Sequence, residues 1–430
     1  MNFQLVAAFL SIGFTLSFGS TFSQASTDSI HEKGILSQLE KLSFEGYGAF
    51  NYYNFNWQTD STRRDAFDNE RFILELGYAW TPKIRLNTEI EFEHGGTGSS
   101  VEFDRFEEFG EFEFDISKGG EVLVEQMNLE FDLRKNMSIR VGRLKVPFGL
   151  SFVRSEPTDY PTATYSEMES QILPNNWTEN GIILQGHFGQ KQKWQYHLGV
   201  VNALDGSAFN SANWIKRGNQ QRFELVNAES FAFTGRIDYG TPDQLQMGVS
   251  FYTGNTTGNR PKPDFKSNAY LALGEYHLSY TQGIFNFNTM IMYGALSNSE
   301  ALSNQNRNLS NNLNVKRTPV AAAALGGFAE IEIKLIRKQK EVASVKSSKP
   351  ELSAIGRIDY YDTMYKTQGE IFNNPRWERT SYTLGAVLKI IEDIHFKTQY
   401  TLRKVGAPAP TSINGGTNEN TFVLGFAFEF

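Results

Sequence analysis

The stretch FILELGYAWTPKIRLNTEIEF, residues 72–92, alternates apolar and polar side chains on both sides of a short break at 81–83. In each half every second residue is mainly apolar, and the residues between them include three glutamates and Arg85. Successive side chains of a β-strand point to opposite faces, so this pattern predicts two antiparallel strands joined by a tight turn. One face of the expected hairpin is apolar and the other is largely polar.

The same alternation recurs along the chain, at residues 127–133, 231–239, 245–251, 285–293 and 422–430. In these segments the apolar phase carries no charged residue, and all the charges fall in the opposite phase. A Lys or Arg that faces lipid costs roughly 2–4 kcal/mol at the bilayer midplane, whereas a water-filled lumen accepts it. The sorting of charge therefore favours a barrel whose outer face lies in lipid.

The alternation predicts about sixteen strands, at residues 44–57, 70–80, 84–95, 121–133, 137–144, 179–188, 194–203, 229–239, 245–253, 267–280, 284–295, 319–336, 351–363, 379–391, 394–403 and 420–430. The gaps between them alternate between long and short, with 337–350 as the exception. Outer-membrane barrels have tight turns in the periplasm and long loops outside. We therefore expect an all-β fold, a transmembrane antiparallel β-barrel with a long third extracellular loop that folds inward.

The N-terminus has the pattern of a secretory signal peptide. Residues 5–18 are apolar over a length too short to cross a bilayer as a helix, and Ser23-Gln24-Ala25 supplies small residues at a cleavage site. We expect residues 1–25 to be the signal peptide, 26–43 a short periplasmic leader, and 44–430 a barrel in the bacterial outer membrane.

The composition excludes several classes of site. The chain has no cysteine, and its six histidines are scattered singly, so we expect no metal site and no cofactor. The net charge is −7 and no basic face is evident, which argues against nucleic acid as a partner. No phosphate-cradling glycine loop is present. The isolated histidines give no nucleophile and base constellation, so we expect no enzyme activity.

The third long loop, about residues 145–178, is the main functional candidate. Loops of this length are usually functional or disordered, and a barrel of sixteen strands leaves an aqueous channel that an inward loop would narrow. Opposite charges across a constriction orient polar solutes, and the alternative is that these are solvated loop charges. The candidate constriction residues that interact with ions are Arg140, Arg143, Lys145, Arg154, Glu156, Asp159, Glu167 and Glu169. The candidate lumen-facing residues are Arg85, Glu89, Glu91, Glu130, Asp132, Arg236 and Asp238.

Short motifs in this region resemble the phosphate-selective porin O and P family. They are VGRLKVPFG at 141–149 and NGIILQG at 180–186, and residues 326–332, 355–360 and 382–402 are also similar. The resemblance implies a sixteen-stranded porin of a Gram-negative outer membrane that assembles as a homotrimer. Phosphate selectivity does not carry over, because the family's basic ladder is missing and residues 101–115 are strongly acidic. These residues and the basic segment 337–350 suggest no defined role.

The last residues suggest partners outside the barrel. Phe430 closes a strand whose apolar phase is largely phenylalanine, which resembles the signal that the barrel-assembly machinery recognises. Trp80, Tyr239 and Tyr280 each precede an expected periplasmic turn, where an aromatic girdle meets the lipid headgroups.

The sequence predicts a porin for passive diffusion of small ions and polar solutes, with phosphate among the candidate anions. Two alternatives stay open: a structural or adhesive outer-membrane barrel with a plugged pore, and an outer-membrane barrel hydrolase. Small residues in the inward phase leave room in the lumen and favour the porin: Gly77, Ala79, Gly248, Ser250, Gly425 and Ala427.

Overall fold

The computed structural model describes residues 39–95, 99–104, 113–118, 121–219, 225–241, 244–309, 317–336 and 350–430. The predicted signal peptide, most of the predicted leader and residues 337–349 lie outside this part of the chain, as do residues 105–112 of the acidic stretch. Residues 43–430 form one compact unit.

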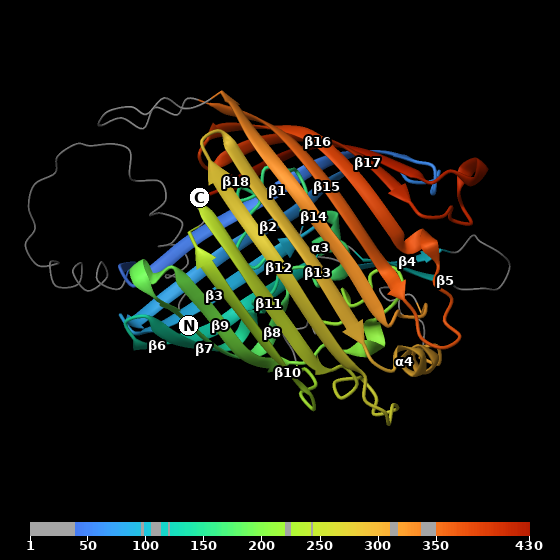
Figure 1. The fold of residues 1–430 in the computed structure, drawn as a ribbon, viewed down its shortest axis with the longest axis horizontal. Helices are drawn as coiled ribbons and strands as arrows, with labels where there is room; N and C mark the ends of the chain where they lie inside the picture. The colour runs from blue at the N-terminus through green and yellow to red at the C-terminus, as the bar shows by residue number, and fades with distance from the viewer. Residues whose placement is uncertain are drawn as a thin grey trace, which may run out of the picture. The chain divides into compact units, whose positions relative to one another are not determined.

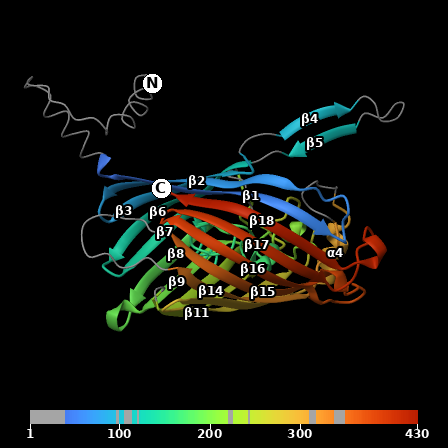
Figure 2. The same cartoon turned by 90° about the horizontal axis from the view of Figure 1, so that it is seen from above.

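In the described part of this unit, sixteen strands close into an antiparallel barrel (Figures 1 and 2). The strands are β1 (Leu42–Trp57), β2 (Ala66–Thr81), β3 (Ile84–Glu93), β6 (Glu121–Arg134), β7 (Met137–Lys145), β8 (Thr178–Phe188), β9 (Trp194–Asn202), β10 (Phe231–Gly240), β11 (Leu245–Asn255), β12 (Tyr270–Gln282), β13 (Phe285–Leu296), β14 (Ala323–Ile336), β15 (Glu351–Lys366), β16 (Glu378–Ile391), β17 (Ile394–Val405) and β18 (Asn418–Glu429). Consecutive strands of the barrel pair in sequence order, and β1 pairs with β18 to close it, from Tyr47 opposite Glu429 to Trp57 opposite Glu419.

Each of the sixteen predicted strands is confirmed, with ends that differ by a few residues. The sequence analysis missed a further pair of strands in the second long loop, β4 (Ser99–Asp104) and β5 (Glu113–Lys118), which pair with each other in a separate two-stranded sheet. This stretch was expected to be an acidic loop because its charges mask an alternation of apolar residues, Val101 with Phe103 and Phe114 with Ile116.

The predicted sorting of side chains is also confirmed. The apolar phase points away from the barrel interior, with Trp80 exposed by 49% and Ile291 by 59%, while Glu89 and Glu91 of the opposite phase are buried. In the described residues no helix combines the length and the apolar character that a membrane crossing requires.

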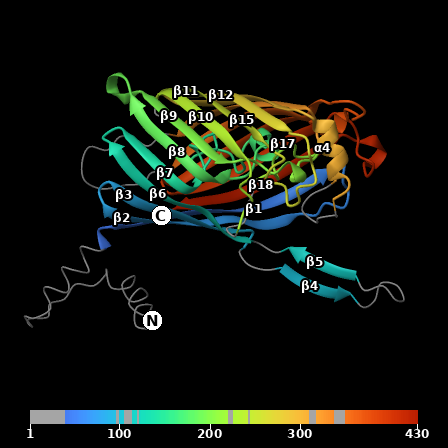
Figure 3. The same cartoon turned by 90° about the horizontal axis from the view of Figure 1, so that it is seen from below.

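Two long loops, residues 146–177 and 203–218, supply an apolar core inside the barrel. The first contains the helix α3 (Glu167–Ile172), which lies behind the front strands in Figure 1. Core residues of these loops pack with inward residues of β9 to β15; the largest are Phe148, Met168, Ile172, Trp177, Phe209 and Trp214 from the loops, and Tyr252, Met290 and Phe328 from the wall. A second helix, α4 (Ser299–Asn306), follows β13 at the end of the barrel where the long loops emerge (Figure 3). The inward course of the third long loop is therefore confirmed.

One argument for an open lumen was wrong. At Gly248 and Gly425 the absent side chain does not leave empty space, because other groups occupy it. A β-carbon added at Gly248 would lie 2.7 Å from the His277 ring. One added at Gly425 would meet Asn51 of β1 and Ala163 of the inward loop. These positions are small because polar side chains and the loop pack against them.

Candidate functional site

The inward loop begins with a turn that requires glycine. Gly149 adopts a φ of +81°, a conformation that other residues rarely adopt. A β-carbon at this position would also lie 2.8 Å from Glu169 Oε1. The carbonyl of Gly149 accepts a hydrogen bond of 2.5 Å from Arg236 Nη1 on β10, so the turn is tied to the barrel wall.

The helix α3 begins with Ser166 as its N-cap. Ser166 Oγ accepts a hydrogen bond of 3.2 Å from the backbone N–H of Glu169, and its hydroxyl lies 3.4 Å from the Glu169 carboxylate. This N-cap satisfies one backbone donor at the start of the short helix. It also fixes the direction of Glu167 and Glu169, which both line the cavity described below.

Lys397 of β17 holds the middle of the loop. Its buried ammonium donates hydrogen bonds to the carbonyls of Pro157, Tyr160 (2.5 Å) and Thr162 (3.0 Å). The ammonium also lies 4.4 Å from the centre of the Tyr160 ring. One side chain of the barrel wall thus orders a turn of the loop that lies far from it in the sequence.

Arg357 of β15 holds the next part of the loop. Its Nη1 donates to Thr162 Oγ1 (2.7 Å) and to the carbonyl of Thr164 (2.9 Å), and its Nη2 donates to the carbonyl of Tyr165 (3.1 Å). Asp359, two residues further along the strand, accepts a hydrogen bond of 2.9 Å from Arg357 Nε and balances its charge.

Arg403 of β17 anchors the helix itself. It forms two hydrogen bonds with the Glu167 carboxylate, at 2.6 and 2.8 Å, and one of 2.9 Å with Glu419. Burial alone would raise the pKa of Glu167. The charge and hydrogen bonds of Arg403 lower it by more, so the pKa lies below its ordinary value. Glu167 is therefore ionised at neutral pH.

Three of these anchors, Arg357, Lys397 and Arg403, were missed as site residues by the sequence analysis. Each lies in the inward phase of its predicted strand, so alternation alone could have placed it in the barrel interior. The loop residues that they bind are far away in sequence, and no local pattern indicates that pairing.

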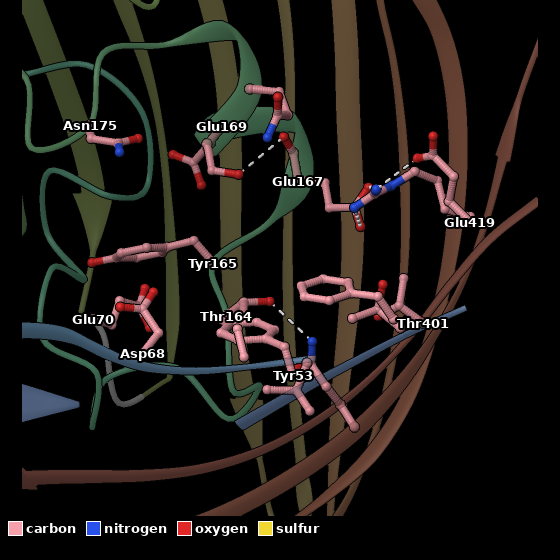
Figure 4. A pocket seen from close by; sticks show the side chains of 18 of the residues that line it. Tyr53, Asp68, Glu70, Thr164, Tyr165, Glu167, Glu169, Asn175, Thr401 and Glu419 are labelled. Atoms are coloured by element: carbon pink, nitrogen blue, oxygen red, sulfur yellow. Dashed lines mark hydrogen bonds and ion pairs between the residues drawn. The ribbon is translucent and has the colours of Figure 1, made fainter. Parts of the chain in front are cut away.

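A cavity of about 740 Å³ lies beside the inward loop, at the end of the barrel from which the long loops emerge. We call this cavity the vestibule. Its wall includes Tyr53, Phe55 and Trp57 of β1 and inward residues of β16 to β18. Figure 4 shows it with Glu167 and Glu169 on the side of α3, and with Thr401 and Glu419 on the barrel wall.

Most carboxylates of the vestibule already have protein donors. Asp68 lies 2.7 Å from His94 Nδ1, and Glu70 accepts a hydrogen bond of 2.5 Å from Asn51. Glu169 accepts one of 3.0 Å from the backbone N–H of Ser151, while its burial raises its pKa. The hydrogen bond with Asp68 raises the pKa of His94.

Two smaller cavities lie elsewhere in the barrel. One of about 340 Å³, at the end with the short turns, is lined by predicted residues Arg85, Glu130 and Asp132, and Arg85 binds Asp132 through two hydrogen bonds of 2.7 and 2.9 Å. A narrow one of about 30 Å³ is lined by Arg154 and Glu169 among others, and shares Glu169 with the vestibule.

The remaining predicted residues lie in the wall or inside the loop. Arg143 is buried, and its Nε donates to the carbonyl of Glu125 at 3.1 Å. The other contacts are Arg140 with Asn128 (3.1 Å), Lys145 with Glu89 (3.3 Å), Glu91 with Arg71 (2.8 Å), Asp238 with Arg236 (2.7 Å), and Asp159 with the backbone of Glu156 (3.1 Å). None of these predicted residues lines the three cavities described here. Their role in ion passage stays a prediction.

Comparison with known proteins gives distant likenesses. No model of a known protein family matches the chain. An uncharacterised protein of Aquifex aeolicus is 32% identical over 218 residues, which cover 50% of this chain and 45% of that relative, so the match spans less than half of the relative's length. The resemblance to the phosphate-selective porin O and P family therefore stays a prediction.

Solved structures that match include the outer-membrane channel DcaP of Acinetobacter baumannii, at 9% identity and a TM-score of 0.49 over 90% of this chain and 97% of that chain. OmpT, an outer-membrane protein of Vibrio cholerae, matches at 10% identity and a TM-score of 0.47 over 90% and 97%. A mutant of the Rh. blastica porin matches at 11% identity and a TM-score of 0.45 over 90% and 100%. Likenesses at this distance identify neither a family nor a solute.

Proposed function

We propose that this chain is a porin of a bacterial outer membrane, through which small ions and polar solutes diffuse passively. The observation that carries the proposal is the closed barrel with an apolar outer face and a charged inner face. A soluble protein gains nothing from exposing rows of large apolar side chains around a polar interior, whereas a barrel in lipid requires that arrangement.

The interior supports an off-centre route rather than a wide axial pore. The apolar core lies against β9 to β15, on one side of the lumen. The vestibule lies against β1, β2 and β15 to β18, whose inward residues include Asn51, Gln399, Thr401 and Thr421. We therefore expect solutes to enter on this polar side, through the vestibule.

Reconstitution in planar bilayers tests the proposal. Folded protein should give discrete, ohmic current steps under an applied voltage. The control is the same preparation after thermal unfolding, which should give no steps, and circular dichroism should verify β-structure in the active sample. A silent bilayer with folded protein would exclude an open channel.

A second candidate is the structural or adhesive barrel with a plugged pore. The core formed by residues 146–177 and 203–218 favours it, because buried Phe209 and Trp214 fill part of the lumen. The bilayer experiment separates the two candidates, since a plugged barrel folds in lipid but carries no current.

The proposal includes the further predictions made from the sequence. They are export by a signal peptide at residues 1–25, assembly as a homotrimer, and insertion by the barrel-assembly machinery through the strand that ends at Phe430. Phosphate would be one of the solutes only if millimolar phosphate blocks the chloride current. An unchanged chloride current would remove phosphate from the list.

A further inference from the structure

We propose that the vestibule binds small organic anions with an apolar body, of the type of an aromatic monocarboxylate. This inference rests on the proposed porin function and names the class of solute that its entrance would concentrate. It follows from the cations of the vestibule, from the state of its carboxylates, and from its aromatic wall.

Two arginines of the vestibule are held by aromatic rings. The guanidinium carbon of Arg63 lies 4.5 Å from the centre of the Phe55 ring and 4.8 Å from that of Trp57. That of Arg379 lies 5.2 Å from the centre of the Trp377 ring. In the described part of the chain, neither guanidinium forms an ion pair with a carboxylate.

Stacking leaves the hydrogen-bonding edge of a guanidinium available. A ring contacts its flat face, whereas its N–H groups point outward in the plane and match the two oxygens of a carboxylate. Such paired, charge-assisted hydrogen bonds are among the strongest in proteins. Arg63 and Arg379 therefore present carboxylate-binding edges to the vestibule that they both line.

Several carboxylates of the vestibule are already paired with other cations of the protein. Arg403 forms ion pairs with both Glu167 and Glu419, and His94 pairs with Asp68. Lys216 also lines the cavity, and burial together with Arg217 lowers its pKa to about 8, so it keeps most of its positive charge at neutral pH. In the described part of the chain, Arg63, Arg379 and Lys216 form no ion pair with a carboxylate, so these three cations remain available to an anion.

The wall of the vestibule supplies apolar contacts for the body of the anion. Tyr53, Phe55 and Trp57 occupy three successive inward positions of β1, with ring centres 5.6 and 5.5 Å apart. Leu173 and Pro174 line the cavity from the inward loop. A volume of about 740 Å³ lies within the range of small-molecule sites and exceeds what an inorganic anion needs.

A sugar fits these observations less well. A neutral sugar cannot form charge-assisted hydrogen bonds with the guanidinium edges of Arg63 and Arg379, whereas a carboxylate can. We therefore favour the anion, and glucose is a probe that can contradict it.

Isothermal titration calorimetry on the full chain in detergent tests the inference, since it requires binding and no conduction. Benzoate should bind, with an affinity that falls as salt rises, and acetate, phosphate and glucose should bind at least about tenfold more weakly. The double variant R63Q/R379Q should weaken benzoate by about tenfold or more, because it removes both carboxylate-binding guanidinium edges.

A matched control removes an arginine elsewhere. Arg134 is exposed and lines the cavity at the opposite end, so R134Q should leave benzoate affinity unchanged. R63K/R379K keeps both charges but loses the paired donors, and should lie between the wild type and R63Q/R379Q.

Benzoate affinity that R63Q/R379Q leaves unchanged would overturn the inference, as would equal affinity for acetate, phosphate or glucose. Binding by a protein that is silent in bilayers would keep the site and exclude the channel. Current without benzoate binding would keep the channel and exclude the site.

Discussion

Lys397 places its side-chain nitrogen inside the barrel, and in the described residues no carboxylate forms an ion pair with it. Removing an ammonium from water costs several kcal/mol unless other groups replace the lost solvation. Three loop carbonyls and the Tyr160 ring do so here. The same contacts that stabilise the charge therefore fix the position of the loop.

We expect Lys397→Met to loosen the loop without unfolding the barrel. Methionine has a similar length but no donor, so three loop carbonyls lose a partner, at about 1–3 kcal/mol for each group that stays buried and unpaired. The ladder bonds of β17 do not change. Hydrogen exchange of residues 155–165 should accelerate, and single-channel current should become noisier.

The control for this substitution is Lys404→Met, which removes an exposed lysine from the same strand. It should leave both measurements unchanged. If Lys397→Met exchanges as slowly as the wild type, the lysine does not hold the loop.

At the scale of elements, the inward loop behaves as a separate part from the strands that it contacts. Its hydrogen bonds to the wall join side chains and carbonyls more than a hundred residues apart in sequence, such as Lys397 with Pro157 and Arg357 with Thr164. The strands depend only on the alternation of their residues and on their neighbours. The loop can therefore loosen while the barrel stays closed.

The loop should respond to pH through Glu156. Burial, a hydrogen bond with Glu429 and the charge of Asp159 raise the pKa of Glu156 to about 8, far above the ordinary value of about 4.3. The folded state then binds a proton that the free loop would release, so docking weakens as pH rises from about 4.3 to about 8. Above pH 8 the ionised carboxylate repels Glu429 and Asp159.

Glu156→Gln should remove this dependence, because glutamine imitates the protonated acid. Hydrogen exchange of residues 154–162, measured at pH 6 and pH 9 and corrected for the intrinsic rate, should differ in the wild type and agree in the variant. Glu370→Gln, which changes an exposed glutamate of another long loop, should behave as the wild type. A wild-type loop with equal protection at both pH values would contradict the prediction.

Elements of this fold differ in how far sequence predicts them. Alternation located all sixteen barrel strands because a residue's phase decides whether it meets the outside or the lumen. It placed Arg236 and Glu91 inside for the same reason, and their burial agrees. It could not pair Lys397 with residues 157–162 or assemble the vestibule, because those contacts depend on where a loop docks after the barrel has closed.

At the scale of the whole molecule, contact with a membrane explains why the outer face of the barrel is apolar. Ile291 lies in the middle of β13 and is exposed by 59%, while Gln282 lies exposed at the end of β12 beside a short turn. In lipid these two positions sit at different depths. In water they would be equivalent surface sites.

Ile291→Lys should therefore destabilise the barrel in lipid vesicles by roughly 2–4 kcal/mol, because the charge would lie near the bilayer midplane. Gln282→Lys should cost about 0–1 kcal/mol, since its charge reaches the interface. Urea titration of tryptophan fluorescence in vesicles measures both. Equal stabilities would place the outer face in water.

The pairing of β1 with β18 has a consequence for how the protein is made. Every other seam of the barrel joins strands that are near neighbours along the chain, but this one waits for segments from opposite ends of the described barrel to meet. Until they do, two strand edges present unpaired N–H and carbonyl groups, which hydrocarbon does not tolerate. We therefore expect a nascent chain to need protection of these two edges until β1 and β18 pair. If the wall of the mature barrel opens, we expect it to open between these two strands.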